Sequence, residues 1–283
     1  MNSKTILVTG SSSGIGLETA LALAQQGHEI ILAARTEQKL KDAVERIKTE
    51  TGNNKLKYYT ANFSSLKSLR ALAENIKRDY TKLDVLVNNA GGVFSGFELN
   101  EDRLEMTIAT NHYSYFLLTG LLLDLLKKAD EGRIVNVASR SSYRGKIDFE
   151  SFTKDKGYFI MKAYGQSKLA NVLFTVELAE RLKGTNITAN CLHPGVVKTD
   201  IGTKDTKWYA SIVWTMLSRM AGISVKDGAK TSVFLATSPE VKGVTGKYFD
   251  LCKAKEPNKD AYNANLRKEL WSISEKYAKY SYL

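Results

Sequence analysis

Apolar runs of strand length alternate with helical periodicity along most of the 283-residue chain. The strand-length runs, several of them nearly continuous in Val, Ile and Leu, are Thr5–Thr9, Glu29–Ala33, Leu56–Ala61, Val85–Asn88, Arg133–Ala138, Thr188–Leu192 and Lys247–Asp250. Helical spacing of apolar residues fills the gaps at Gly16–Gln26, Glu37–Thr49, Leu66–Asp79, Leu104–Lys128, Lys162–Leu182 and Lys226–Ala236. This alternation predicts an α/β fold, a doubly wound parallel sheet of about seven strands with helices on both faces.

We expect one domain over residues 1–283, because no internal repeat, low-complexity tract or flexible linker divides the chain. Residues 251–283 are predicted to form a C-terminal helical extension that covers a binding pocket or serves a subunit contact. Two segments, 146–161 and 202–224, interrupt the alternation after predicted strands. Since ligands bind at the carboxyl ends of strands in open α/β sheets, both are predicted to be functional loops.

Composition is that of an ordinary globular protein. Apolar residues make up 43% of the chain and charged residues 25%, which excludes a disordered or fibrous protein. The two cysteines, Cys191 and Cys252, cannot form a disulfide framework and indicate a reducing compartment. No run approaches a membrane span, and the first predicted strand begins too early to leave room for a signal peptide. We therefore expect a soluble, cytoplasmic protein.

The chain is basic, with 41 Lys and Arg against 30 Asp and Glu and a net charge of +11. Such an excess is typical of proteins that bind nucleic acid or anionic membranes. Here the positive charges are spread along helices without a nucleic-acid-binding motif, so we interpret most of them as solvated surface and predict no nucleic-acid partner. The aromatic residues of 208–220 leave peripheral membrane contact as an alternative.

A glycine-rich turn, Thr9-Gly-Ser-Ser-Ser-Gly-Ile-Gly16, directly follows the first predicted strand and opens a helix. Glycines allow a tight turn here and let a pyrophosphate approach the helix N-terminus, whose free N–H groups favour anions. Placed between the first strand and the first helix of an alternating chain, this turn predicts a Rossmann-type dinucleotide site.

The end of the second predicted strand indicates which dinucleotide binds. An NAD site carries an acidic residue there to bind the adenosine ribose, whereas this chain has Leu32-Ala-Ala-Arg-Thr36. The planar guanidinium of Arg35 suits the oxygens of a 2′-phosphate. We therefore predict NADP (NADPH) in preference to NAD, with an ordinary surface arginine as the alternative for Arg35.

Tyr164 and Lys168 are four residues apart at the start of a strongly periodic helix, and so lie on one helical face. An unperturbed Tyr, with a pKa of about 10, is a poor base at neutral pH. Because a nearby ammonium stabilises the phenolate, the spacing predicts a lowered pKa for Tyr164. Alone, such a pair is common by chance and would be a surface pair, so its weight comes from the motifs around it.

Taken in order, these motifs resemble those of the short-chain dehydrogenase/reductase family over roughly residues 4–250. The matching positions are Thr-Gly-x-x-x-Gly-x-Gly at 9–16, Asn-Asn-Ala-Gly at 88–91, Asn111, Ser139, Tyr164-x-x-x-Lys168, and Pro194-Gly195 followed by Thr199. The spacing of 25 residues between Ser139 and Tyr164, and details such as Leu-Ala-Ala-Arg35, look more narrowly like the retinol-dehydrogenase-like branch.

The resemblance implies a cofactor role for each matched position. The phosphates would lie against Gly10, Ser12, Gly14 and Ile15, and the 2′-phosphate would lie against Arg35. The adenine would contact Asn62, and the adenosine half would lie along Asn89, Ala90 and Gly91. The nicotinamide ribose would contact Tyr164 and Lys168, and the carboxamide would contact Val197 and Thr199. Asn62 replaces the usual Asp of the family. Its amide oxygen can still accept the adenine hydrogen bond, but without the charge.

The resemblance also implies the catalytic residues Asn111, Ser139, Tyr164 and Lys168. Tyr164 would donate a proton to a carbonyl oxygen as hydride reaches the carbon, Ser139 would hydrogen-bond that oxygen, and Asn111 would help relay protons through water. Ser141 and Ser142 lie close to Ser139 in the sequence, and we favour Ser139 because it ends a predicted strand.

The sequence therefore predicts an NADP(H)-dependent oxidoreductase that interconverts a carbonyl and an alcohol on a small, apolar substrate of the retinoid, steroid or lipid type. The alternative is a non-catalytic NADP-binding module that senses redox state. No metal site is expected, because the three histidines lack metal-ligand spacing. The apolar stripe Phe116–Leu123 fits the core of a helix, and a homodimer contact of the kind common in the family is the alternative.

Overall fold

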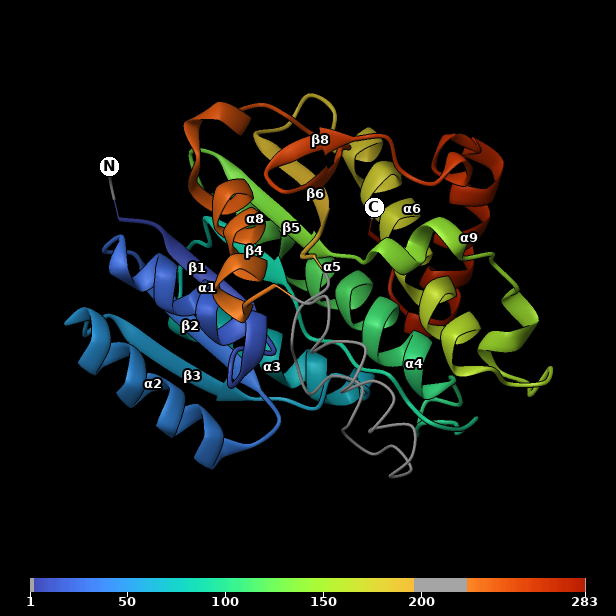
Figure 1. Ribbon diagram of the computed structural model, residues 1–283, viewed down its shortest axis with the longest axis horizontal. Helices are drawn as coiled ribbons and strands as arrows, with labels where there is room; N and C mark the ends of the chain where they lie inside the picture. Colours follow the sequence, from blue (N-terminus) through green and yellow to red (C-terminus); the bar gives the residue numbers. More distant parts are fainter. Residues whose placement is uncertain (1–2, 196–222, 283) are drawn as a thin grey trace.

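The computed structural model describes residues 3–195 and 223–282, which form three layers with one sheet in the middle (Figure 1). Within these residues the sheet has eight strands in the order β3-β2-β1-β4-β5-β6-β7-β8. The strands are β1 (Thr5–Thr9), β2 (Glu29–Ala34), β3 (Leu56–Thr60), β4 (Val85–Asn88), β5 (Gly132–Val137), β6 (Ile187–His193), β7 (Tyr248–Asp250) and β8 (Lys253–Lys255). All neighbours pair in parallel except β7 and β8, which are antiparallel.

Helices cover both faces of this sheet. They are α1 (Gly14–Gln25), α2 (Glu37–Thr51), α3 (Leu66–Asp79), α4 (Met106–Ile108), α5 (Ser114–Lys127), α6 (Ile160–Arg181), α8 (Val225–Thr237) and α9 (Ala264–Ala278), with the short helices η1 (Ala109–Tyr113), η2 (Arg140–Arg144), η3 (Phe149–Phe152), η5 (Pro239–Val241) and η6 (Lys259–Tyr262). Apolar residues of α1, α2 and α8 join one face of the sheet in one core cluster, whereas α3, α5, α6 and α9 share the other. The predicted doubly wound α/β fold is confirmed.

Each of the seven predicted strands is present within one residue of its predicted ends. The eighth strand, β8, was not expected from the sequence because it is short, exposed and rich in lysine. It joins β7 through Leu251 and Cys252, whose φ angles are 50° and 60°. Gly, Asn or Asp usually supplies such angles in a two-residue hairpin, so the turn carries no recognisable sequence signal.

The helix predicted over 104–128 is divided in the structure into α4, the π-helical turn η1 and α5. It begins at Met106 because the carboxylate of Glu105 accepts hydrogen bonds from the N–H groups of Thr107 and Ile108. The π-helical turn contains Asn111, and such turns are frequent at functional sites. Hydrophobic periodicity does not distinguish a π-helical turn from a continuous α-helix.

Residues 251–283, predicted to be a helical extension, contain the strand β8, the short helix η6 and the helix α9, which packs against α6 and α5 (Figure 1). Trp271 is 3% exposed and stacks on Phe174, with ring centroids 5.9 Å apart. The rings of Phe116 and Tyr282 approach it to 5.2 and 4.6 Å, and the guanidinium of Arg181 lies 4.1 Å from its ring centre. An aromatic cluster therefore fastens the C-terminal extension to the sheet-covering helices.

The stripe Phe116–Leu123 packs within the chain, which confirms that it is helix core. Phe116 and Leu117 have no exposed surface, and Tyr282 donates a hydrogen bond to the carbonyl of Phe116. A Cβ at Gly120 would lie 2.3 Å from the ring of Tyr280, so this position has no room for a side chain. The C-terminal residues Tyr280 and Tyr282 therefore contact this stripe.

The first predicted loop, 146–161, contains the short helix η3 and ends where α6 begins at Ile160. The second, 202–224, lies outside the described residues except for its last two positions. In the part of the chain that the structure describes, no helix combines the length and apolar character needed to cross a membrane.

The docking of α9 is expected to contribute strongly to stability. Trp271→Ala removes a buried ring from the aromatic cluster and should lower the free energy of unfolding by about 3–5 kcal/mol in urea denaturation. The matched control is Tyr262→Ala, because Tyr262 is 62% exposed and a surface change of this kind costs about 0.5 kcal/mol or less. Equal effects of the two substitutions would contradict a stabilising role for the cluster.

Candidate active site

The glycine-rich turn between β1 and α1 is held against the segment that follows β4. Gly10 and Gly14 have φ angles of 66° and 58°, in the left-handed region that favours glycine. A Cβ at Gly10 would lie 2.8 Å from Cα of Ala90, and one at Gly16 would lie 2.4 Å from the carbonyl oxygen of Gly10. Ser13, the N-cap of α1, makes no side-chain cap hydrogen bond. The start of α1 therefore keeps N–H groups that can donate hydrogen bonds to a bound anion.

A cavity of about 650 Å³ runs along this turn. Its walls include every predicted cofactor residue that the structure describes, apart from the Tyr–Lys pair: Gly10, Ser12, Gly14, Ile15, Arg35, Asn62, Asn89, Ala90 and Gly91. Beyond Gly91 the wall becomes more apolar, with Val93, Phe94 and Met106. Val197 and Thr199 lie outside the described residues.

The Arg35 end of the cavity is positively charged. Lys39 and Arg46 of α2 line the same end. Arg46 is engaged by Glu18 and Glu50 at 2.9 and 2.7 Å, whereas neither Arg35 nor Lys39 has an ion-pair partner among the described residues. Lys39 was missed from the sequence, although it lies in the first turn of α2, which begins two residues after Arg35.

Asn62 lies in the cavity wall with its side chain already engaged. Its Oδ1 accepts hydrogen bonds from the N–H and the hydroxyl of Ser64, at 3.1 and 2.9 Å. Any contact of Oδ1 with an adenine would therefore share this oxygen with Ser64.

Tyr164 and Lys168 lie one turn apart on α6 and are 8% and 3% exposed. Nζ of Lys168 donates a hydrogen bond to the carbonyl of Val137 at 2.9 Å and lies 5.8 Å from the ring centre of Tyr164. Val137 is the last residue of β5, so the end of this strand faces the Tyr–Lys pair. The hydroxyl of Ser139, two residues further along, lies close enough to Tyr164 to lower its pKa.

The two neighbouring serines have other contacts. The N–H of Ser141 donates to the hydroxyl of Ser139 at 3.2 Å, and the hydroxyl of Ser142 lies beside Tyr248. The structure therefore brings Ser139, rather than Ser141 or Ser142, to Tyr164.

Asn111 connects the Tyr–Lys pair to the cavity. Its Oδ1 accepts from the N–H of Gly92 at 2.8 Å, and its Nδ2 donates to the carbonyl of Gly92 and to the hydroxyl of Ser167, both at 2.9 Å. A Cβ at Gly91 would lie 2.9 Å from Oδ1 of Asn111 and 3.5 Å from Nζ of Lys168. Asn111 and Lys168 therefore lie directly behind the Gly91 end of the cavity.

Burial moves the pKa values of Tyr164 and Lys168 away from their usual ranges. Burial raises the pKa of Tyr164, and the nearby hydroxyl of Ser139 partly opposes this rise. Burial also lowers the pKa of Lys168 to about 7. The lowered pKa of Tyr164 predicted from the spacing is therefore wrong for these side chains alone, because loss of hydration disfavours both the phenolate and the ammonium. At neutral pH the Tyr164 hydroxyl is protonated and acts as a donor.

Comparison with known proteins shows the family to which the chain belongs. The sequence profile described as short chain dehydrogenase matches residues 4–210. The chain belongs to the short-chain dehydrogenase family. Retinol dehydrogenase 13 of Homo sapiens is 40% identical over 275 residues, 96% of this chain and 83% of that protein. Retinol dehydrogenase 14 of Mus musculus is 38% identical over 286 residues, 97% of this chain and 86% of that protein.

Among solved structures, a variant of actinorhodin polyketide ketoreductase with NADPH superposes with a TM-score of 0.70 and 28% identity, over 87% of this chain and 95% of that one. These similarities confirm the resemblance to the retinol-dehydrogenase-like branch and identify this short-chain dehydrogenase as an oxidoreductase.

The buried Lys168 is expected to make stability depend on pH. A lysine whose pKa is lowered by folding binds fewer protons in the folded than in the unfolded state, so its penalty is full below about pH 7 and disappears toward about pH 10.4. Lys168→Met should therefore raise the free energy of unfolding by about 1–2 kcal/mol at about pH 6. The gain should shrink at about pH 9.5.

Urea denaturation at both pH values measures this gain. The control is Lys162→Met, an exposed lysine on the same helix, which should leave the pH dependence unchanged. A gain from Lys168→Met that is equal at the two pH values would contradict a buried Lys168 whose pKa is lowered by folding.

Proposed function

We propose that this short-chain dehydrogenase interconverts a carbonyl and an alcohol on an apolar substrate with NADP(H), and that Tyr164 is the general acid and base. The observation that carries the proposal is the position of Gly91, which lines the cavity and lies in contact range of Asn111 and Lys168. Lys168 in turn lies beside Tyr164, and the hydroxyl of Ser139 lies close to Tyr164. The proposed catalytic group is thus joined to one end of a dinucleotide-binding cradle.

The residues present fit a dinucleotide phosphate. Because a Cβ at Gly10 or Gly16 would collide with main-chain atoms, only glycine allows this tight turn beside the cavity. The start of α1 offers N–H groups to an anion, and the volume of about 650 Å³ is that of a cofactor site. At the far end Arg35 and Lys39 supply unpaired positive charge for a 2′-phosphate. The ketoreductase that this chain resembles is described with NADPH, which supports the same choice here.

The chemistry expected of the chain's own residues follows from where their protons are. When bound, a reduced nicotinamide supplies hydride to the carbonyl carbon. Tyr164, protonated because it is buried, donates its hydroxyl proton to the carbonyl oxygen on which negative charge grows. Ser139 donates a hydrogen bond to that oxygen, and Lys168, with a pKa of about 7, can gain or lose a proton one turn away. In the oxidative direction Tyr164 accepts the proton.

The structure suggests a narrower role for Asn111 than a proton relay by its side chain. Both polar atoms of the amide are occupied by Gly92 and Ser167, so this side chain fixes the main chain beside Gly91.

The proposed substrate class is apolar, of the retinoid, steroid or lipid type. Past Gly91 the cavity is lined by Val93, Phe94 and Met106, which offer hydrophobic contact and no charge. The relatives at about 40% identity are named as retinol dehydrogenases, which supports a carbonyl or alcohol carried on an apolar group.

Removal of the proposed acid is expected to abolish turnover without loss of cofactor. Tyr164→Phe should lower kcat for reduction of apolar aldehydes with NADPH by about 10²- to 10⁴-fold, because proton donation is lost. The Kd for NADPH, measured by calorimetry, should stay within about threefold. The control is Tyr143→Phe, since Tyr143 donates its hydroxyl hydrogen to Glu256, away from the cavity.

Activity that survives in Tyr164→Phe would contradict the assignment of the acid. A wild-type protein that binds NADPH tightly yet reduces no apolar aldehyde or ketone would favour the non-catalytic, redox-sensing module instead.

Arg35 is expected to select NADPH over NADH. Arg35→Ala removes a charged hydrogen-bond donor to the 2′-phosphate and should raise the Kd for NADPH by about 10- to 100-fold, with little change in the Kd for NADH. Lys48→Ala, which removes one exposed charge near the end of α2, controls for a general electrostatic effect. Equal weakening of both cofactors by Arg35→Ala would contradict a 2′-phosphate site.

A further inference from the structure

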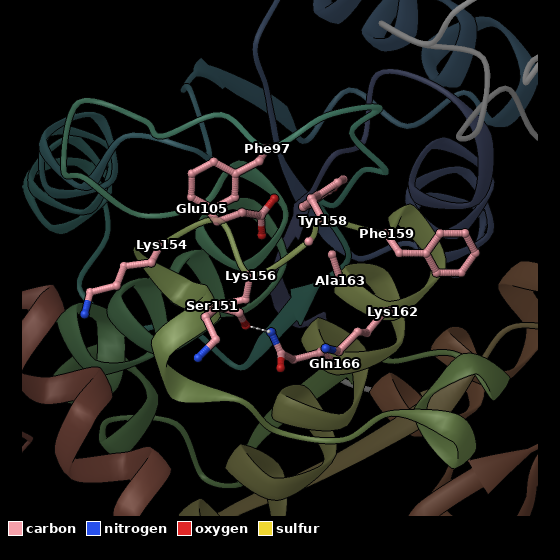
Figure 2. Close-up of a pocket in the computed structure, with 11 residues that line it drawn as sticks. Phe97, Glu105, Ser151, Lys154, Lys156, Tyr158, Phe159, Lys162, Ala163 and Gln166 are labelled. Carbon is pink, nitrogen blue, oxygen red and sulfur yellow. Dashed lines mark hydrogen bonds between the residues drawn. The ribbon is translucent and has the colours of Figure 1, made fainter.

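The segment between η2 and α6 is tied to two different parts of the molecule. On one side, Gln166 of α6 accepts from the N–H of Asp148 at 2.7 Å and donates to the hydroxyl of Ser151 at 2.9 Å (Figure 2). On the other side, the N–H of Glu105 donates to the carbonyl of Phe152 at 2.8 Å. The segment therefore connects the helix of Tyr164 to the start of α4.

Tyr158, near the end of this segment, contacts both the loop after β4 and the start of α4. Its hydroxyl donates to the carbonyl of Phe94 at 2.8 Å and lies 3.0 Å from the hydroxyl of Thr107. Because a phenol has one hydrogen, which goes to Phe94, Thr107 is the donor of the second bond. Burial raises the pKa of Tyr158 to about 12, so this hydrogen is retained throughout the neutral range.

Both partners of the Tyr158 hydroxyl belong to segments that line the apolar end of the main cavity. Phe94 lines it directly, and Thr107 follows Met106, which lines it from the first turn of α4. Glu105 fixes the same turn by accepting from the N–H groups of Thr107 and Ile108 at 2.7 and 3.0 Å.

Figure 2 shows Tyr158 close to Glu105 and Phe97. The ring of Phe97 meets that of Tyr158 edge-on at 6.3 Å. Ring packing and the hydroxyl contacts therefore act at one point, where the segment from η2 to α6 meets the loop after β4 and the start of α4.

We propose that Tyr158 is a positioning residue for the substrate. Its hydroxyl holds the loop 92–98 on the start of α4 and so fixes the width of the apolar end of the cavity. This hydroxyl acts beside the main-chain bond from the N–H of Met106 to the carbonyl of Glu98. The identity of the substrate that the wall selects rests on the proposed function. Among the described residues the Tyr158 hydroxyl bonds with Phe94 and Thr107, and not with the glycine-rich turn or Arg35. The cofactor end should therefore not respond to its loss.

The first experiment isolates the hydroxyl. Tyr158→Phe keeps the ring contact with Phe97 and removes both hydrogen bonds, and Tyr143→Phe is the matched control. In hydrogen exchange of the full-length protein, peptides covering 92–99 and 106–110 should exchange about fivefold faster or more in Tyr158→Phe. Peptides covering 10–18 should not change, and the control should match wild type throughout.

The second experiment reads the consequence for substrate. For a bulky apolar aldehyde, Tyr158→Phe should raise KM about tenfold, equivalent to about 1.4 kcal/mol, with kcat within about twofold. The Kd for NADPH should be unchanged. Thr107→Val, which loses the donor to Tyr158, should move KM in the same direction, and Thr107→Ser, which keeps a hydroxyl, should restore it.

Unchanged exchange in 92–99 would overturn the proposal, as would faster exchange with an unchanged KM or a parallel rise in the Kd for NADPH. If the wild-type protein reduces no aldehyde, the proposed function fails on that result. The exchange of 92–99 then decides by itself whether the Tyr158 hydroxyl orders the wall.

Discussion

The close approach of the turn after β1 to the segment after β4 is the constraint on which the candidate site depends. The hydroxyl of Thr9 accepts from the N–H groups of Asn89 and Ala90, both at 2.9 Å, and the side chain of Asn89 donates to the carbonyl of Thr9 at 2.8 Å. Only a glycine fits at position 10, because Ala90 lies against it. β1 and β4 are the neighbours at which the strand order reverses, so these contacts form where a doubly wound sheet opens a crevice. They fix both the phosphate cradle and the chain that leads to Gly91.

The turn that carries Asn111, one of the proposed catalytic residues, is held in part by the C-terminal helix α9. His112, the residue after Asn111 in the π-helical turn, lies 2.8 Å from the hydroxyl of Ser274 on α9. Ser274 donates its hydrogen to the carbonyl of Leu270, so it accepts from His112, whose Nε2 carries the hydrogen. Burial lowers the pKa of His112 to about 3, so the ring is neutral at neutral pH and its single hydrogen is on Nε2. The aromatic cluster around Trp271 thus stabilises a helix that also holds the turn presenting Asn111.

Much of this arrangement could be predicted from the sequence, and what could not has physical reasons. Continuous apolar runs define the strands because both faces of the sheet are covered, and the motif order placed Ser139 and Tyr164 together although 25 residues separate them. The π-helical turn, the contact of Ser274 with His112 and the bond from Tyr158 to Phe94 leave no periodic trace, because each depends on one side chain meeting a distant partner. The sign of the Tyr164 pKa shift was wrong for a related reason, since spacing reveals a neighbouring lysine but not its burial.

The two ends of the cavity are ordered by different kinds of contact, and this bears on how such a protein can change its substrate. Along the glycine-rich turn the main chain itself lines the cavity, and the close approach of Ala90 leaves no room for a side chain at Gly10. At the apolar end the wall is a loop and a short helix joined through the side chains of Tyr158, Thr107 and Glu105. Side-chain contacts can be exchanged one at a time, whereas the strand ends that carry Gly10 and Ser139 belong to the sheet. The fold therefore separates the proposed catalytic residues, which are fixed with the core, from the proposed substrate wall, which a few substitutions can reshape.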